Sequence, residues 1–218
     1  MPKTISKENT LKHATALAAY LLIVWGFYRL IFKLPEEIEE LLVKPIVWLV
    51  PVFVLVVRER RGLESVGITL RNLFPSVYFA LGLGAIFVIE ALILNYLKYG
   101  GLNFAANIGD KILFASLGIS FATAISEEIT FRGYIFGRVW EVTRNEWLAN
   151  LSTNAVWTLI HIPWLLFVQR LTIGPLLVNL LVTAAFGVGS AFVFARTRNI
   201  LSSIFLHVLW AWPIILFR

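Results

Sequence analysis

Repeated apolar runs constrain this chain more than any other feature of its sequence. An α-helix needs about 20 predominantly apolar residues to cross the hydrocarbon core of a bilayer. Several runs of about this length follow one another, separated by short polar connections, and we read them as about seven spans. They cover residues 14–32, 41–57, 77–97, 112–140, 151–168, 173–195 and 200–217. The pattern predicts an all-α fold, a polytopic transmembrane helix bundle.

The composition supports the same fold class. Hydrophobic residues make up 59% of the 218 residues, charged residues make up 15%, and the mean hydropathy is +0.80. Soluble domains of this size carry fewer apolar and more charged residues. The apolar runs leave little chain for an extramembrane domain. We therefore expect residues 1–218 to form a single domain that is integral to the cell membrane and surrounded by the lipid bilayer.

The basic residues indicate a membrane orientation. The net charge of +6 would also suit a nucleic-acid partner, but the Lys and Arg residues form short groups between apolar runs. This scatter favours membrane topology, and we expect no nucleic-acid partner. In a seven-span arrangement, Lys and Arg are more numerous in the loops on the side of the N-terminus, which predicts a cytoplasmic N-terminus. The absence of cysteine excludes disulfides and thiol nucleophiles.

Several polar residues and one proline that precede the fourth predicted span lead to predictions of their own. The connection at residues 33–44 carries Glu36, Glu37, Glu39 and Glu40. It can form an interfacial amphipathic turn or short helix, or a solvated charged face, and we predict the solvated face. His13, in the polar leader, is expected to be a solvated surface histidine. Pro51 interrupts the second apolar run and is expected to kink it. Glu90 lies within the third run, where it either faces a cavity and pairs with a cation or is solvated near the interface.

Residues 126–133 place three charges inside an apolar run, in the order Ser-Glu-Glu-Ile-Thr-Phe-Arg-Gly. In a helix, Glu128 and Arg132 are four residues apart and share a face, whereas Glu127 is rotated by about 100° from Glu128. We predict that Glu128 and Arg132 neutralise each other and lock the helix. Glu127 is then predicted to be a free carboxylate facing a polar cavity, because a charge in hydrocarbon is costly.

Two histidines lie inside apolar runs, at the same predicted depth as Glu127. At a rise of about 1.5 Å per residue, Glu127, His161 and His207 all fall in the half of the membrane near the N-terminal side. They support two chemistries. One is a site in which the three side chains bind a divalent metal such as zinc and leave a position for water. In the other, Glu127 is a general base helped by one histidine while the other stabilises an oxyanion.

These residues resemble the motifs of the CAAX prenyl endopeptidase and bacteriocin-processing family of intramembrane proteases (CPBP or ABI family). The family signature Glu-Glu-x-x-x-Arg is similar to Glu127-Glu128-Ile-Thr-Phe-Arg132. The element Phe-x-x-x-His is similar to Trp157-Thr-Leu-Ile-His161, with Trp in place of Phe. The resemblance covers about residues 112–212, which we expect to form the catalytic core.

The resemblance implies hydrolysis of a peptide bond in a membrane-associated peptide or protein substrate, whether lipidated or not. Glu127 and His161 would position and activate water, and His207 would lie at the oxyanion. The family places an Asn four residues after this last histidine, where the present chain has Ala211. An alanine side chain cannot donate a hydrogen bond. Asn154 shares a helical face with His161 and is predicted to supply the substitute amide.

Two other functions stay open from the sequence. Because Ala211 removes an expected donor, the chain can instead be a catalytically impaired or inactive relative that acts as a membrane adaptor or immunity factor. A proton-coupled transporter that uses Glu90, Glu127 and the two histidines as a relay is the third alternative.

Overall fold

The computed structural model describes residues 6–32, 34–103 and 113–217, without the side chains of residues 113 and 212–217. The regular secondary structure of these residues is helical throughout, which confirms the predicted all-α class. Within this part of the chain, five helical segments are long and apolar enough to cross a membrane, by length and composition. They are Lys7–Ile31, Glu36–Arg58, Leu73–Tyr99, Glu146–Val168 and Ile173–Thr197.

The two other predicted spans lie on helices that do not meet the same criteria. One is the helix that begins with α5 (Leu113–Glu128), and its predicted start near Ile112 lies outside the described residues. The other is α9 (Ile200–Phe217), of which Ile200–Ala211 is counted as a shorter apolar helix. The structure is thus compatible with seven spans, and five of its described helices meet the criteria of length and composition for a span. The protein is an integral membrane protein.

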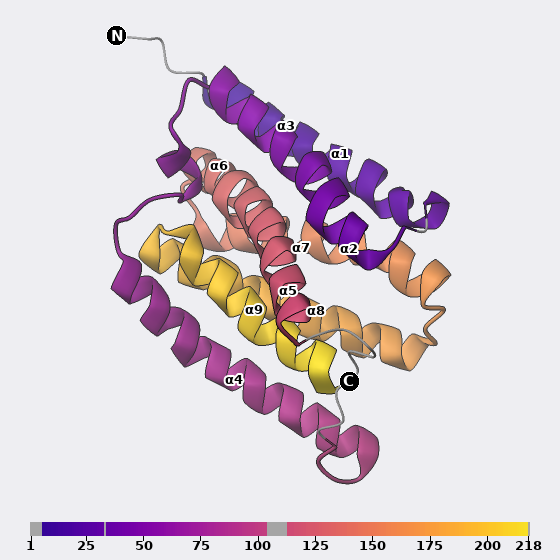
Figure 1. Ribbon diagram of the computed structural model, residues 1–218. Helices are drawn as coiled ribbons and strands as arrows, with labels where there is room; N and C mark the ends of the chain where they lie inside the picture. Colours follow the sequence, from indigo (N-terminus) through magenta and orange to yellow (C-terminus); the bar gives the residue numbers. More distant parts are fainter. Residues whose placement is uncertain (1–5, 33, 104–112, 218) are drawn as a thin grey trace.

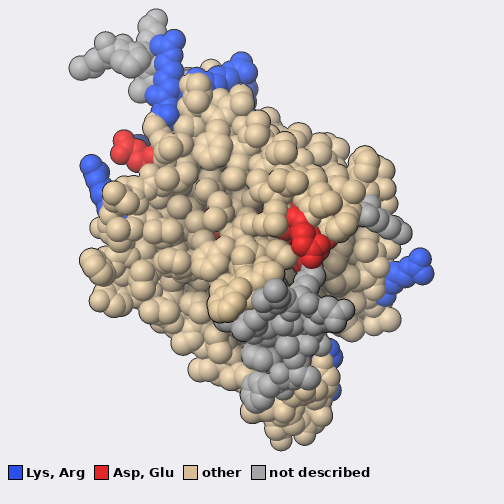
Figure 2. All heavy atoms as spheres, in the orientation of Figure 1, with Lys and Arg blue, Asp and Glu red and all other residues tan. Residues whose placement is uncertain are grey.

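Helix α5 lies inside the bundle, where it packs against α3 (Lys44–Arg58) and α9 (Figure 1). On the far side of α9, α4 (Leu73–Tyr99) forms an outer layer that also contacts α8 (Ile173–Thr197). Figure 2 shows one face of the molecule that is almost free of charged side chains, with Lys and Arg near its edges. A broad uncharged face of this kind suits contact with lipid tails.

Helix α7 (Glu146–Pro163) packs between α1 (Lys7–Ile31) and α8. The final turn of this segment is the π-helical η4 (Trp164–Val168), which also contacts α1. Of the two helices that carry the intramembrane histidines, α9 contacts α5 directly, and α7 contacts the π-helical segment Ile129–Phe136 that continues α5. This arrangement brings chain segments that are distant in sequence to the same part of the bundle.

The second membrane-crossing segment begins earlier than the sequence predicted. It runs from α2 (Glu36–Ile38) through the π-helical η1 (Glu39–Val43) into α3, and it continues past Pro51. The prediction of a solvated acidic connection was wrong for Glu39 and Glu40, because both are only 5% exposed. The cationic side chains of Arg29 and Lys44 compensate these buried carboxylates.

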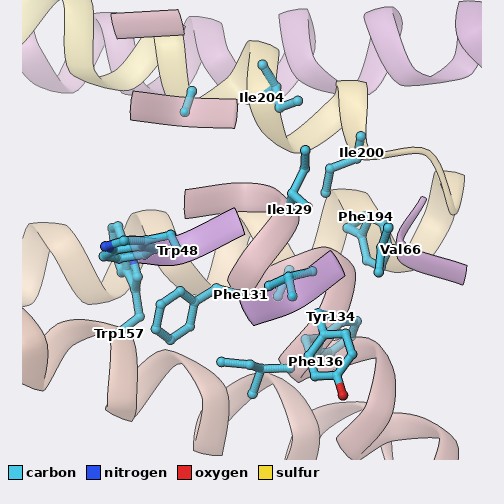
Figure 3. Close-up of a cluster of buried hydrophobic side chains, with 14 of the residues drawn as sticks. Trp48, Val66, Ile129, Phe131, Tyr134, Phe136, Trp157, Phe194, Ile200 and Ile204 are labelled. Atoms are coloured by element: carbon cyan, nitrogen blue, oxygen red, sulfur yellow. The ribbon is translucent and has the colours of Figure 1, made fainter. Parts of the chain in front are cut away.

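The charged segment 126–133 continues α5 without interruption. It passes into the π-helical η3 (Ile129–Phe136) and then α6 (Gly137–Thr143). All eight residues of η3 are buried, and several of its hydrophobic side chains belong to the core cluster of Figure 3. π-Helical turns occur often at functional sites, because they change which face each side chain occupies. At Gly133, a Cβ atom would lie 2.5 Å from the Val66 carbonyl oxygen, so only glycine permits this approach.

His13 does not behave as the solvated histidine that the sequence predicted. Its Nδ1 lies 3.2 Å from Oε1 of Glu59, a buried carboxylate that follows α3. Glu59 also accepts hydrogen bonds from Tyr134 Oη at 2.6 Å and from Arg138 Nε at 2.7 Å. Polar contacts thus join α1, the end of α3 and the η3–α6 helix at one end of the bundle.

Candidate active site

Glu127 and His161 line the same small cavity between α1, α3, α5 and α7. Its volume is about 40 Å³, enough for a water molecule. The other lining residues come mainly from α1, α3 and the end of α7. They are Trp25, Gly26, Arg29, Lys44, Trp48, Ile160 and Trp164. The structure thus brings together one predicted carboxylate and one predicted histidine at a site where water fits.

Both carboxylate oxygens of Glu127 have a partner. Lys44 Nζ lies 2.7 Å from Oε1, and Trp157 Nε1 donates a hydrogen bond to Oε2 at 2.9 Å. The prediction that Glu127 remains a free carboxylate was therefore wrong. Trp157 occupies the position that is Phe in the resembling motif, and a phenyl ring could not make this hydrogen bond. The substitution in the motif thus supplies a direct contact to the central carboxylate.

Lys44 belongs to a buried network of charges. Its Nζ lies 2.7 Å from Glu40 Oε2, which also accepts a hydrogen bond from Thr123 Oγ1 at 2.6 Å. Arg29 pairs with Glu39 and with Glu40. With Glu127, the network contains two cations and three carboxylates. These mutual contacts explain how several charges can be buried inside an apolar bundle.

Sequence reasoning did not single out Lys44, which lies where the predicted polar connection meets the second apolar run. Its side chain is buried, and its ammonium group also lies 5.4 Å from the ring centre of Trp25 and 5.6 Å from that of Trp48. Cation–π contacts of this kind stabilise a desolvated ammonium. The spacing of Glu40 and Lys44, four residues apart, was a usable signal, because such pairs meet on one helix face.

His161 is oriented by the backbone of its own helix. Its Nδ1 lies 2.7 Å from the carbonyl oxygen of Trp157, one helical turn earlier. A carbonyl oxygen only accepts hydrogen bonds, so Nδ1 carries the hydrogen in this contact. In the neutral ring, Nε2 then has the lone pair and can accept a proton. This is the tautomer that a base at the cavity requires.

Glu128 makes the predicted ion pair with Arg132 and accepts a hydrogen bond from Ser190. Arg132 Nη1 lies 3.2 Å from Glu128 Oε1, and Ser190 Oγ donates to Oε2 at 2.6 Å. Arg132 also donates to the Gly187 carbonyl at 3.3 Å and stacks 4.6 Å above the Trp157 ring centre. Glu128 and Arg132 therefore tie η3 to α8, as well as pairing within their own helix.

His207 binds to Glu128 rather than to Glu127. Its Nδ1 lies 2.7 Å from Glu128 Oε1, and the ring is 3% exposed. The Trp157 ring lies near both imidazoles, with centroid distances of 4.8 Å to His161 and 6.2 Å to His207. Both histidines thus lie next to one tryptophan, and of the two only His161 lines the cavity with Glu127.

Comparison with known families covers the part of the chain that holds both histidines. Residues 109–213 match the model of the family described as type II CAAX prenyl endopeptidase, Rce1-like. This match, over just under half of the chain, supports placing the protein in the CAAX prenyl endopeptidase family. No curated protein and no solved structure matches the chain.

The family region does not include every residue of the candidate site. Glu127, Trp157, His161 and His207 lie within the matched residues, whereas Lys44 comes from the preceding half of the chain. The cavity therefore lies between the Rce1-like region and helices outside the family match. A description based on the family motifs alone leaves out one of the two direct partners of Glu127.

The predicted substitute amide, Asn154, does not line the cavity with Glu127 and His161. Its Nδ2 donates to the Ala184 carbonyl at 2.9 Å, which joins α7 to α8. Ala211 lies half-buried on α9, one helical turn after His207. The structure thus shows a helix-packing role for Asn154.

The observed arrangement differs from the predicted metal centre. Over the described ranges, no three His, Asp or Glu side chains are grouped so that they could hold a metal ion. Glu127 and His207 are instead each paired with other residues of the chain. The residues present therefore do not fit a metal centre made of Glu127, His161 and His207, and the mechanism below uses none.

Proposed function

We propose that this protein is a glutamate-dependent intramembrane endopeptidase, in which Glu127 and His161 activate a water molecule for attack on a peptide bond. The observation that carries this proposal is the shared cavity, which is lined by both side chains and has room for water. The match of residues 109–213 to the type II CAAX prenyl endopeptidase family supports the same class of reaction. The whole chain is proposed to act as one membrane domain.

The contacts of Glu127 and His161 suggest how the proton moves. Water in the cavity would donate one hydrogen bond to the Glu127 carboxylate and the other to Nε2 of His161. As the water oxygen attacks the carbonyl carbon of the substrate, one of these bases accepts its proton. The same proton then passes to the nitrogen of the leaving amine. Lys44 and Trp157 would keep the carboxylate of Glu127 oriented during this sequence.

His207 is proposed to act at the oxyanion. Its Nδ1 is held by Glu128 at 2.7 Å, so an imidazolium at His207 would be paired and would have Nε2–H available for donation. Arg132 and Ser190 fix the other contacts of Glu128. Glu128 and Arg132 thus support the site structurally. A donor at the oxyanion contributes about 100- to 1000-fold to turnover in other enzymes.

The substrate class follows from the membrane setting. The cavity lies inside a bundle of apolar helices, so we propose a membrane-associated peptide or protein as the substrate. The family description names a prenyl endopeptidase, which makes a prenylated peptide the first lipid-modified substrate to test. An otherwise identical peptide without the prenyl group shows whether the lipid is needed.

The test of the proposed function is cleavage of these peptides by the purified protein in detergent or in lipid nanodiscs. We expect Glu127→Gln to abolish cleavage, because the amide cannot act as a base, and His161→Ala to do the same. Glu8→Gln is the matched control, since Glu8 is exposed and pairs only with the exposed Lys12. Cleavage by Glu127→Gln at the rate of the natural protein would contradict the proposal.

A second function is favoured by Ala211. If the missing amide has removed turnover, the protein acts as a membrane adaptor or immunity factor with the architecture of a protease. The discriminating experiment introduces Ala211→Asn. Cleavage that appears only in this variant supports the adaptor, whereas cleavage by the natural protein supports the enzyme.

A further inference from the structure

A second and larger cavity lies at one end of the bundle, away from Glu127. Its volume is about 550 Å³. The loop after α3, the η3–α6 helix and the turn between α8 and α9 form its walls, and Figure 1 shows these segments at the same end of the bundle. Four arginines and two glutamates are the charged residues among its lining: Arg61, Arg138, Arg144, Arg198, Glu64 and Glu141. The cavity therefore has an excess of positive charge.

The walls of this cavity are held by hydrogen bonds between distant segments. Arg138 Nη1 donates to the Ser65 carbonyl at 3.0 Å, and the backbone nitrogen of Ile200 donates to the Gly67 carbonyl at 2.9 Å. Asn199 Nδ2 donates to the Thr69 carbonyl at 3.0 Å. The loop after α3 is thus fixed to both other walls, and the cavity is preformed.

Two of the four guanidinium groups already have carboxylate partners. Arg61 binds Glu141 through two parallel contacts, of 2.6 and 2.8 Å. Arg138 donates from Nε to Glu59 Oε2 at 2.7 Å. The positive charges of Arg61 and Arg138 are therefore neutralised by carboxylates of the protein, and the two side chains form part of the cavity wall.

Arg144 and Arg198 differ from this pair. Both are exposed, and neither forms a hydrogen bond or an ion pair with another described residue. The Arg198 guanidinium lies 3.7 Å above the ring centre of Trp140, another residue of the cavity wall. Stacking on a ring leaves the N–H groups at the edge of the guanidinium free to bind a ligand.

The backbone at these two positions would suit glycine better than arginine. Arg144 follows α6 and Arg198 follows α8, with φ values of +58° and +53°. This left-handed conformation at the end of a helix is usually taken by glycine, since a Cβ atom disfavours it. The helix dipole favours a cation equally well one residue earlier, where the backbone is relaxed. Arg60 and Arg170 share this conformation without lining the cavity, so the assignment of a ligand rests on the position of Arg144 and Arg198 in the cavity wall.

We propose that this cavity binds a phosphate group, held by Arg144 and Arg198. Guanidinium groups match the oxygens of phosphate through paired hydrogen bonds, and the excess of positive charge in the cavity favours an anion. The cavity lies where the membrane-crossing helices end, which is also where phospholipid headgroups are found. The phosphate can belong to a lipid headgroup or to a soluble compound, and the proposal is independent of the hydrolytic function.

The test compares two double variants that lose the same charge. Arg144→Gly with Arg198→Gly removes both proposed ligands and places glycine where the backbone favours it, so folding is preserved. The control is Arg60→Gly with Arg170→Gly. Arg60 and Arg170 also have positive φ, of +55° and +53°, and neither lines the cavity. Loss of general electrostatic attraction would therefore affect both variants equally.

Two probes distinguish the sources of the phosphate. Equilibrium dialysis measures the binding of radiolabelled inorganic phosphate to the protein in neutral detergent. Thermal unfolding in phosphatidylcholine nanodiscs, with and without phosphatidic acid, measures binding of a phosphate headgroup through the rise in melting temperature. Sodium chloride keeps the ionic strength equal in all samples.

We expect saturable binding in at least one arm, weakened at least tenfold by the cavity variant and unchanged in the control. Binding of phosphatidic acid alone identifies a lipid headgroup, and binding of inorganic phosphate alone identifies a soluble compound. Binding of both shows that the phosphate group itself is recognised. No saturable binding in either arm, or an equal loss in the two double variants, overturns the proposal.

Discussion

The ammonium of Lys44 lies 2.7 Å from Oε1 of Glu127, in the interior of the bundle. The two residues come from different parts of the chain, since Lys44 begins α3 and Glu127 is next to the end of α5. Their side chains are buried together with Glu40, whose Oε2 is also 2.7 Å from Lys44. One cation thus joins two carboxylates that would otherwise repel each other.

We expect Lys44→Met to lower the free energy of unfolding by about 3 kcal/mol, because removing one partner of a buried ion pair leaves the other charge uncompensated. The measurement is chemical unfolding in detergent micelles. Lys12→Met is the control, since Lys12 forms an exposed pair with Glu8 that contributes little. Equal stability of the two variants would show that Lys44 does not compensate the buried carboxylates.

Trp157→Phe restores the residue found in the resembling motif but removes the Nε1–H that binds Glu127. We expect kcat/KM for peptide cleavage to fall about tenfold or more, since a hydrogen bond to a charged group contributes about 1.5–3 kcal/mol. Trp210→Phe is the matched control, because Trp210 Nε1 has no hydrogen-bond partner within the described chain. A similar loss in both variants would mean that ring size, rather than the hydrogen bond, determines the rate.

Much of the fold could be predicted from apolar runs, because a membrane-crossing helix must be apolar over most of its length. Several of the observed helices begin earlier than the runs do, however. The helix from Glu36 includes an acidic first turn, and α7 begins at Glu146 after Asn145, whose side chain accepts a hydrogen bond from the Leu148 nitrogen. Polar residues that cap or begin a helix are invisible to a hydropathy criterion.

The candidate site was only partly predictable, because spacing along one helix says little about the neighbouring helices. The Glu128–Arg132 pair followed from the four-residue spacing and is observed. The partner of Glu127 did not follow from it, since Lys44 comes from a segment 83 residues away from Glu127 in sequence. Residue counting placed His207 at the predicted depth of Glu127, but a predicted depth could not show that its imidazole binds Glu128. Such pairings depend on how the helices rotate against one another.

Gly187→Ala tests the close packing of α7 against α8. A Cβ atom at Gly187 would overlap the side chain of Asn154, whose Nδ2 is held by the Ala184 carbonyl. We expect the free energy of unfolding to fall by about 1–3 kcal/mol. Gly118→Ala is the control in α5, where no atom lies within 4 Å of the added Cβ and alanine favours the helix. The double variant Gly187→Ala with Asn154→Ala should recover part of the loss, and a loss that is not reduced would exclude this overlap as the cause.

The orientation of the protein in the membrane can be tested at the two ends of α4. Glu64 precedes this helix and Leu102 follows it, and both side chains are exposed. Since α4 has 27 residues, these ends are about 40 Å apart, enough to lie on opposite sides of a bilayer.

The natural chain has no cysteine, so Glu64→Cys and Leu102→Cys each introduce one thiol. With a cytoplasmic N-terminus, an impermeant maleimide should label Leu102→Cys in intact cells and Glu64→Cys only after lysis. The opposite pattern would reverse the orientation and place the arginine-lined cavity on the external side.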